Sequence, residues 1–214
     1  MTTQERFAMM HEYGVDPESS EIWLVGEDHA WDDLGAGDEP GVEYLMANRL
    51  IKNLRLLSSI GNEEVLVHMK SCGGDEVEGF AIYDALRLCP MKVSILSYTH
   101  ARSMTSVILQ AAEYRFLMPS SYMLLHWGQF SIEGEYKMVQ SNLEFAAKRE
   151  QRYLDVFADR MVCGERWKNI KKVPRRKAVV KWLKEHMADK IDVILEPEEA
   201  IYLGLADEIY NGDF

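Results

Sequence analysis

The chain has 214 residues, 47% of them hydrophobic, which is enough apolar surface for one core and one main domain. Its formal net charge of −11 argues against nucleic acid or an anionic membrane as the general partner. The first 20 residues lack the pattern of a signal peptide, no apolar run approaches the length of a membrane span, and the three scattered cysteines suit a reducing compartment. We therefore expect a cytoplasmic protein without a disulfide framework or a metal site.

Charge is unevenly distributed along the chain. Residues 1–42 hold 11 acidic side chains and one basic side chain, whereas residues 161–190 hold 10 basic and three acidic ones. Both stretches fit solvated surfaces, and the basic one could alternatively contact an acidic partner. The basic stretch carries no aromatic or glycine pattern of a known nucleic-acid-binding module.

Short apolar runs alternate with stretches of helical periodicity. Strands are predicted at 21–26, 64–69, 92–98, 114–119, 122–127, 191–195 and 207–210. Helices are predicted at 42–60, 77–89, 136–161 and 197–206, with a further one opening at Ser103. This succession predicts parallel strands joined by crossover helices, which is an α/β fold.

The predicted helix at 136–161 is unusually long for a small core. A helix of this length spans roughly 39 Å. We expect it to protrude from the body and to pack on another subunit.

The stretch "SCGGDE" places Gly73 and Gly74 directly after a predicted strand. Paired glycines permit unusual dihedral angles and leave backbone N–H groups unshielded. Such a loop suits an oxyanion hole or a platform for an extended peptide. It also fits a plain tight turn.

Ser103 stands where a strand meets a helix, in "THARSM". A nucleophile at a helix start could develop an oxyanion beside the N–H of Met104. A serine that only caps the helix is the common alternative.

His126 ends the apolar run "YMLLHW". A Ser–His pair needs a third group to orient the imidazole. Four carboxylates could serve, namely Asp155, Asp159, Asp189 and Asp192. Asp192 opens the apolar run "DVIL", so it is the one most firmly held near a core.

Taken in order, four stretches resemble the proteolytic subunits of the Clp protease family, serine peptidases of the ClpP type (family S14). They are "SCGGDEVEGFAIYDAL", "THARSM", "LMPSSYMLLHWG" and "DVILEPEEAIYLGLADEIY". The family's corresponding segments are Ser-Pro-Gly-Gly, Gly-x-Ala-Ala-Ser-Met, a Leu-Pro segment ending in Met-Ile-His, and an Asp-Arg-Phe-Leu-Ser-Ala-Pro-Glu-Ala ending. The resemblance runs from about Glu21 to Tyr210.

The resemblance implies roles for five residues. Ser103 matches the nucleophile, His126 the general base and acid, and Asp192 the residue that orients the histidine. Gly73 and Met104 match the two backbone donors of the oxyanion hole. The family needs no metal or organic cofactor at this site.

The resemblance also implies a fold and an assembly. The family has a ClpP/crotonase-like α/β fold with a protruding handle helix, which 136–161 resembles. Its subunits form heptameric rings stacked as a tetradecamer, and an AAA+ unfoldase supplies unfolded protein or peptide substrate. An extended substrate would pair with backbone near Gly74, Asp75 and Gly128.

Several positions depart from the family pattern. Cys72 replaces a proline, Thr99 replaces a glycine, and Arg102 replaces the small residue before the nucleophile. Residues 1–20 do not match the axial segment, so we divide the chain into that divergent segment and a peptidase domain at 21–214. These departures favour a divergent member of the family. Three alternatives stay open: a virus-encoded capsid-maturation peptidase, a catalytically inactive structural subunit, and a crotonase-type enzyme that acts on acyl-thioesters.

Overall fold

The structure is a computed structural model that describes residues 1–24, 41–128, 131–190 and 192–212. Its described part contains one eight-stranded sheet with strand order β1-β2-β3-β4-β5-β8, and β6 joins this sheet by pairing with β4 and β7. The strands are β1 (Val15–Asp16), β2 (Glu21–Leu24), β3 (Glu64–Ser71), β4 (Lys92–Arg102), β5 (Tyr114–Leu117), β6 (Tyr122–Leu125), β7 (Val193–Leu195) and β8 (Glu208–Ile209). The helices are α1 (Thr3–Ala8), η1 (Met9–Tyr13), α2 (Tyr44–Ser59), α3 (Glu76–Arg87), α4 (Met104–Leu109), α5 (Tyr136–Met161), η2 (Glu165–Trp167), α6 (Lys172–Asp189) and α7 (Pro197–Leu203).

The α/β prediction is confirmed, and most strand pairs are parallel. Two pairs are antiparallel, β1 with β2 and β6 with β7. The prediction of parallel strands therefore fails only at these two pairs: a short turn joins β1 to β2, whereas α5, η2 and α6 lie between β6 and β7 in the chain. The last two residues of the strand predicted at 21–26 lie outside the described residues.

β4 and α6 are among the elements that differ from the sequence prediction. β4 continues to Arg102, four residues beyond its predicted end, because His100 to Arg102 pair with β6. The basic stretch, for which no element was predicted, forms α6. Only a narrow stripe of α6 is buried, formed by Val179, Leu183 and Met187, so helical periodicity is weak in the sequence.

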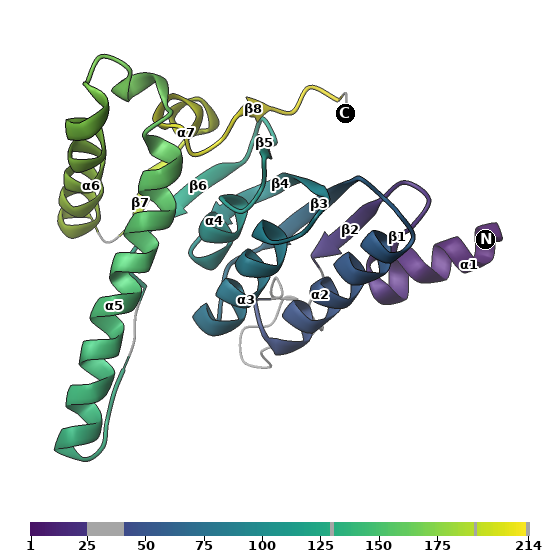
Figure 1. Cartoon of the computed structure of the whole chain (residues 1–214), viewed down its shortest axis with the longest axis horizontal. Coiled ribbons are helices and arrows are strands. Elements are labelled where there is room, and N and C mark those ends of the chain that lie inside the picture. Colours follow the sequence, from purple (N-terminus) through teal and green to yellow (C-terminus); the bar gives the residue numbers. More distant parts are fainter. Residues whose placement is uncertain (25–40, 129–130, 191, 213–214) are drawn as a thin grey trace.

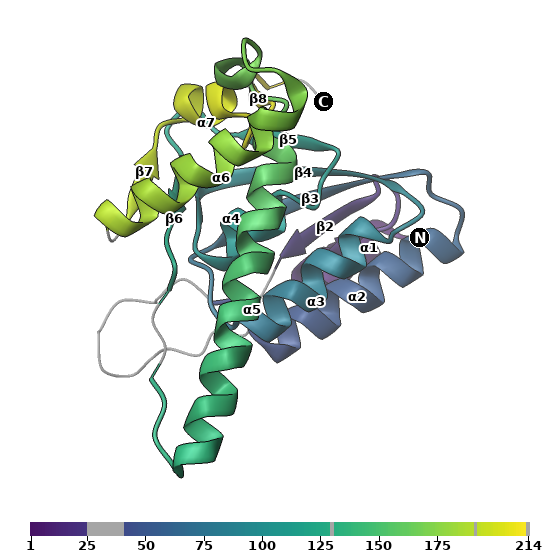
Figure 2. The ribbon, with the colours of Figure 1, turned by 60° about the vertical axis from the view of Figure 1, so that its left-hand side comes forward.

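The helices α2, α3, α4 and α5 pack in succession beside the sheet, and α6 packs on α5 (Figures 1 and 2). The first half of α5 projects away from the sheet and the other helices. All buried residues of this helix lie in its second half, from Leu154 onward. Tyr136, Leu143 and Phe145 in the first half are exposed.

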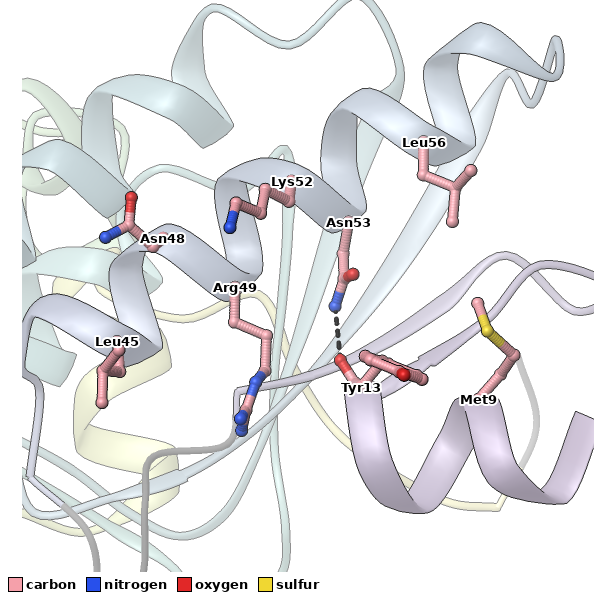
Figure 3. Close-up of a pocket in the computed structure, with 8 residues that line it drawn as sticks. All are labelled: Met9, Tyr13, Leu45, Asn48, Arg49, Lys52, Asn53 and Leu56. Carbon is pink, nitrogen blue, oxygen red and sulfur yellow. Dashed lines mark hydrogen bonds between the residues drawn. The ribbon is translucent and has the colours of Figure 1, made fainter.

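The N-terminal segment packs against α2. Asn53 on α2 is buried and donates a hydrogen bond from Nδ2 to the carbonyl of Tyr13 at 2.7 Å (Figure 3). Met9 and Leu56 lie on opposite sides of the groove that separates the two segments. β1 also pairs with β2 across residue 20, so residues 1–20 are structurally continuous with the domain.

A buried histidine lies among aromatic rings on β2, β3 and β4. The ring of His68 stacks on Trp23 with centroids 4.7 Å apart. Its Nδ1 is 2.9 Å from the Tyr98 hydroxyl, and its Nε2 is 3.2 Å from a carboxylate oxygen of Glu21. Burial lowers the pKa of His68 below its usual 6.5, although Glu21 acts in the opposite direction.

Arg115 is a buried cation at the start of β5. Its Nε and Nη2 donate to the carboxylate of Asp207 at 2.8 and 2.6 Å. Its Nη1 donates to the side-chain oxygen of Gln110 at 2.8 Å and to the carbonyl of Gly204 at 2.9 Å. One guanidinium therefore ties the end of α4, the end of α7 and the residue before β8 together.

We expect acid to destabilise the fold through His68. The folded state disfavours the protonated imidazole, so the unfolded state binds the proton more readily as pH falls through 6.5. The free energy of unfolding of the wild type should therefore fall between about pH 7.5 and about pH 5 by more than that of His68→Gln. Urea unfolding at several pH values measures this, and identical pH dependence in the two proteins would contradict it.

We expect Arg115→Met to lower the free energy of unfolding by about 3 kcal/mol, because it leaves buried acceptors without their donor. The matched control is Lys92→Met. Lys92 pairs with Glu64 at 3.7 Å with both side chains exposed, so its loss should cost less than about 1 kcal/mol. Urea unfolding compares them, and equal losses would show that the Arg115 network is not a special source of stability.

Candidate active site

Ser103 occupies a strained turn between β4 and α4. Its φ of 53° and ψ of −127° lie where side chains other than glycine are rarely found. Its side chain makes no capping hydrogen bond, and the Ser106 hydroxyl instead donates to the Ser103 carbonyl at 2.6 Å. The alternative interpretation of Ser103 as a side-chain cap is therefore wrong. A strained serine between a strand and a helix is the arrangement that exposes a nucleophilic hydroxyl.

A single threonine hydroxyl secures this turn. Thr105 is fully buried, and its Oγ1 accepts from the N–H of Arg102 at 2.9 Å. The same oxygen lies 2.7 Å from the carbonyl of Arg102 and 3.1 Å from that of Ser71, to either of which it can donate. It thus links the end of β4 to the end of β3, from which the glycine loop begins.

Gly73 packs its backbone directly against this turn. A Cβ at Gly73 would lie 2.7 Å from Ser103 Cβ and 2.9 Å from the nitrogen of Met104, closer than real contacts allow. The φ of 91° at Gly73 likewise favours glycine. The glycine loop and the first N–H groups of α4 therefore meet beside Ser103, as two oxyanion donors must.

Met104 is held from behind by the long helix. Its side chain is buried and fills the space next to Gly79, where a Cβ would lie 2.5 Å from Met104 Cε. The hydroxyl of Tyr153 on α5 lies 2.9 Å from Met104 Sδ. Burial raises the pKa of Tyr153, so this hydroxyl stays protonated. The position of α5 is thereby coupled to the residue that follows Ser103.

The register of β4, β6 and β7 determines where His126 and Asp192 lie. Arg102 on β4 pairs with Leu124 on β6, and Leu124 pairs with Ile194 on β7. Two residues past Leu124, and therefore on the same face, is His126. Because β6 and β7 are antiparallel, Asp192 is the residue that comes opposite His126.

His126 and Asp192 form a pair at the end of this register. Nδ1 of His126 is 3.5 Å from a carboxylate oxygen of Asp192, and the two side chains are 26% and 47% exposed. Within the part of the chain that the structure describes, Nε2 of His126 is buried and has no hydrogen-bond partner. The imidazole is thus oriented by a carboxylate at one nitrogen and has an unused nitrogen at the other.

The other candidate carboxylates do not reach this histidine's pairing position. Asp155 and Asp159 both bind Arg176 on α6. Asp189 is exposed at the end of α6. The structure therefore places only Asp192, of the four candidates, opposite Nδ1 of His126.

The predicted substrate-contacting residues are partly engaged within the chain. The N–H of Val42 donates to the Gly73 carbonyl at 2.7 Å, and the N–H of Asp75 donates to the Val42 carbonyl at 2.8 Å. The carboxylate of Asp75 caps α3 through the N–H of Glu78. Gly74 lies within this paired stretch, so one backbone edge of the loop is already occupied.

Gly128 is exposed with a φ of 74°, two residues beyond His126, and residues 129 and 130 lie outside the described part. The binding roles of Gly74, Asp75 and Gly128 remain predictions.

Neither a metal site nor a membrane span is found among the described residues. Across the described residues, no group of three or more histidine, cysteine, aspartate or glutamate side chains is arranged to hold a metal ion. Among the same residues, no helix is both long and apolar enough to cross a membrane.

A strained serine after a parallel strand, a glycine loop against it and a His–carboxylate pair on the neighbouring strands are typical of serine hydrolases. The family model described as Clp protease matches residues 39–213. The chain therefore belongs to the Clp protease family and is a serine-type endopeptidase by class.

Known proteins similar to the chain have modest sequence identity. The ATP-dependent Clp protease proteolytic subunit of Deinococcus radiodurans is 29% identical over 173 residues, covering 79% of this chain and 76% of that protein. Subunit 2 of the same name from Pseudomonas aeruginosa is 26% identical over 171 residues, covering 79% and 77%. Subunit 1 from Streptomyces avermitilis is 34% identical over 117 residues, covering 52% and 54%. The chain is thus a divergent relative of these proteins.

The sequence patterns did not indicate three residues that shape the site. Thr105 and Val42 hold the two loops in place through backbone partners, and Tyr153 supports Met104 from α5. A threonine three residues after a strand end is a weak sign of such a turn. No local pattern marks Val42 or Tyr153, because their partners are distant in sequence.

We expect the strain at Ser103 to be measurable as stability. Ser103→Gly and Ser103→Ala both remove the hydroxyl, but only glycine adopts a positive φ without cost. The glycine variant should therefore be more stable than the alanine variant by about 1 kcal/mol. Urea unfolding of the two variants measures this difference, and an alanine variant of equal or greater stability would contradict a strained Ser103.

Proposed function

We propose that this chain is the peptidase subunit of an assembly that hydrolyses peptide bonds of unfolded proteins through Ser103, His126 and Asp192. The observation that carries the proposal is the strained Ser103 at the end of β4, beside β6, whose end leads into His126 and its partner Asp192. A fold without catalytic use for this turn would gain stability by placing glycine there.

The mechanism follows from the positions of these groups. His126 Nε2 accepts the proton of Ser103 as Oγ attacks the substrate carbonyl carbon, and Asp192 holds the imidazolium at Nδ1. The N–H groups of Gly73 and Met104 stabilise the tetrahedral oxyanion, with each such donor typically contributing about 3 kcal/mol. His126 then protonates the leaving amine, which departs as the C–N bond breaks. Water hydrolyses the acyl-enzyme by the same proton transfers.

The unpaired Nε2 of His126 fits the role of a general base at rest. A Ser–His hydrogen bond is often long or absent before substrate arrives. Contact between α5 and Met104 gives subunit packing a direct way to adjust the oxyanion donor. In this proposal the Ser103–His126 hydrogen bond forms when subunit assembly or substrate binding fixes the contact between α5 and Met104.

We propose that the exposed apolar half of α5 packs on other copies of this chain. Tyr136 is 81% exposed, and Leu143 and Phe145 are 51% and 56% exposed. Tyr136 and Leu143 lie on one face of the helix and Phe145 on the opposite face, and exposed apolar side chains of this size favour burial at an interface. By resemblance to the family, the assembly is a pair of heptameric rings served by an AAA+ unfoldase, which would bind ATP itself. We propose a cytoplasmic location on the same ground.

Two alternatives predict different results. A catalytically inactive structural subunit would fold and assemble but would not react with serine-directed reagents. A capsid-maturation peptidase would react in the same way as the proposed enzyme but would need no ATPase.

The proposal predicts one covalent adduct when the chain reacts with a fluorophosphonate. Intact-mass spectrometry should show that adduct on wild type and none on Ser103→Ala. His126→Ala should slow labelling by at least about 100-fold, because the hydroxyl loses its base. Asp192→Asn should slow it by at least about tenfold.

The matched control is Ser106→Ala. This residue lies three positions away and uses its hydroxyl only to stabilise the turn. It should keep the adduct. A folded, assembled wild type that never reacts would favour the inactive subunit and overturn the proposal.

A further inference from the structure

Arg102 has a side chain that the fold does not use. Its backbone N–H and carbonyl both contact the Thr105 hydroxyl, so the main chain does the structural work at this position. The side chain is exposed, and within the described residues its guanidinium has no ion pair or hydrogen bond. Other arginines near the site are engaged, since Arg149 pairs with Glu76 and Arg152 with Asp84.

The strand register directs this free cation toward the catalytic face. Arg102 immediately precedes Ser103, and its partner Leu124 lies two residues before His126 on the same face of β6. The third residue of the row, Ile194, is 58% exposed, and it lies two residues from Asp192. The register therefore places the Arg102 cation and the exposed Ile194 side chain beside His126 and Asp192, on the same face of the sheet.

The carboxylates that surround this row have other uses. Asp192 faces His126 at 3.5 Å. Glu196 and Glu199 satisfy each other's backbone at the start of α7. A guanidinium without a carboxylate partner among the described residues, next to the proposed peptide-binding site, can receive one from the substrate, since its planar N–H fork matches a carboxylate with two hydrogen bonds.

We propose that Arg102 forms a subsite for a carboxylate carried by the substrate within one or two residues of the scissile bond. The inference rests on the proposed peptidase function and adds a substrate preference to it. Peptides with glutamate or aspartate beside the cut would bind in preference to their amide counterparts. Arg102 is then a specificity-determining residue, and the chemistry remains with Ser103 and His126.

The test measures protection of Ser103 by peptides, so it needs no turnover. Short unstructured peptides are made in pairs that differ only by glutamate or glutamine, at each of the positions flanking one central bond. Each peptide competes with the fluorophosphonate, and the labelling rate is followed by intact mass. On wild type, glutamate at one of these positions should protect at about tenfold lower concentration than glutamine. Added salt should reduce the difference.

Two variants assign the effect to the side chain. Arg102→Gln should erase the difference between glutamate and glutamine peptides, and Arg102→Glu should reverse it, so that the glutamine peptide protects at the lower concentration. Arg55→Gln, which changes an exposed arginine on α2, should keep the wild-type preference. Labelling without peptide reports whether each variant retains a reactive Ser103.

The outcomes separate the two proposals. Absence of labelling on folded wild type overturns the peptidase function itself. Normal labelling with equal protection by both members of every pair, or no protection by any peptide, overturns the carboxylate subsite alone. A preference that survives in Arg102→Gln places acid recognition elsewhere and also overturns it.

Discussion

The close contact between the backbone of Gly73 and the strained turn at Ser103 is the constraint on which the rest of the site depends. No side chain fits between them, since a Cβ at Gly73 would approach Ser103 Cβ to 2.7 Å. The contact brings the end of β3 to the end of β4, and the buried Thr105 hydroxyl fixes the two at hydrogen-bond distance. Strain at one residue is tolerated because its neighbours on both sides leave it no other conformation.

Residues before α2 and on α5 contact the glycine loop and α4, and so connect the rest of the fold to this turn. The N–H and carbonyl of Val42 pair with the glycine loop just before α2 begins, and Tyr153 supports Met104 from α5. Arg160 on the same helix donates to the carbonyls of Gln110 and Ala112, where α4 ends. The helix whose free half extends from the body is therefore attached to both ends of α4. Any interface that moves this helix acts directly on the site.

The departures from the family pattern fall where the fold makes few demands. Thr99 and Arg102 are both exposed on β4, and the backbone of Arg102 keeps its pairing with Leu124 on β6. Substitution at these exposed positions leaves the contact between Gly73 and the Ser103 turn intact. Surface side chains around the site can therefore change while the backbone arrangement is kept. Such changes fit the modest identity of 29% between the chain and the Deinococcus radiodurans subunit.

The sequence by itself determined the order and type of the main elements, because α2, α3 and α5 carry strong helical periodicity and the central strands are short apolar runs with turns between them. It also indicated Ser103, His126 and Asp192 as residues worth testing, through motifs at strand ends. Only the tertiary structure decided that Ser103 does not cap its helix, that the Asp192 carboxylate lies 3.5 Å from His126 Nδ1, and that Arg115 is buried. These outcomes depend on strand register and on partners far away in the chain, which local sequence patterns do not encode.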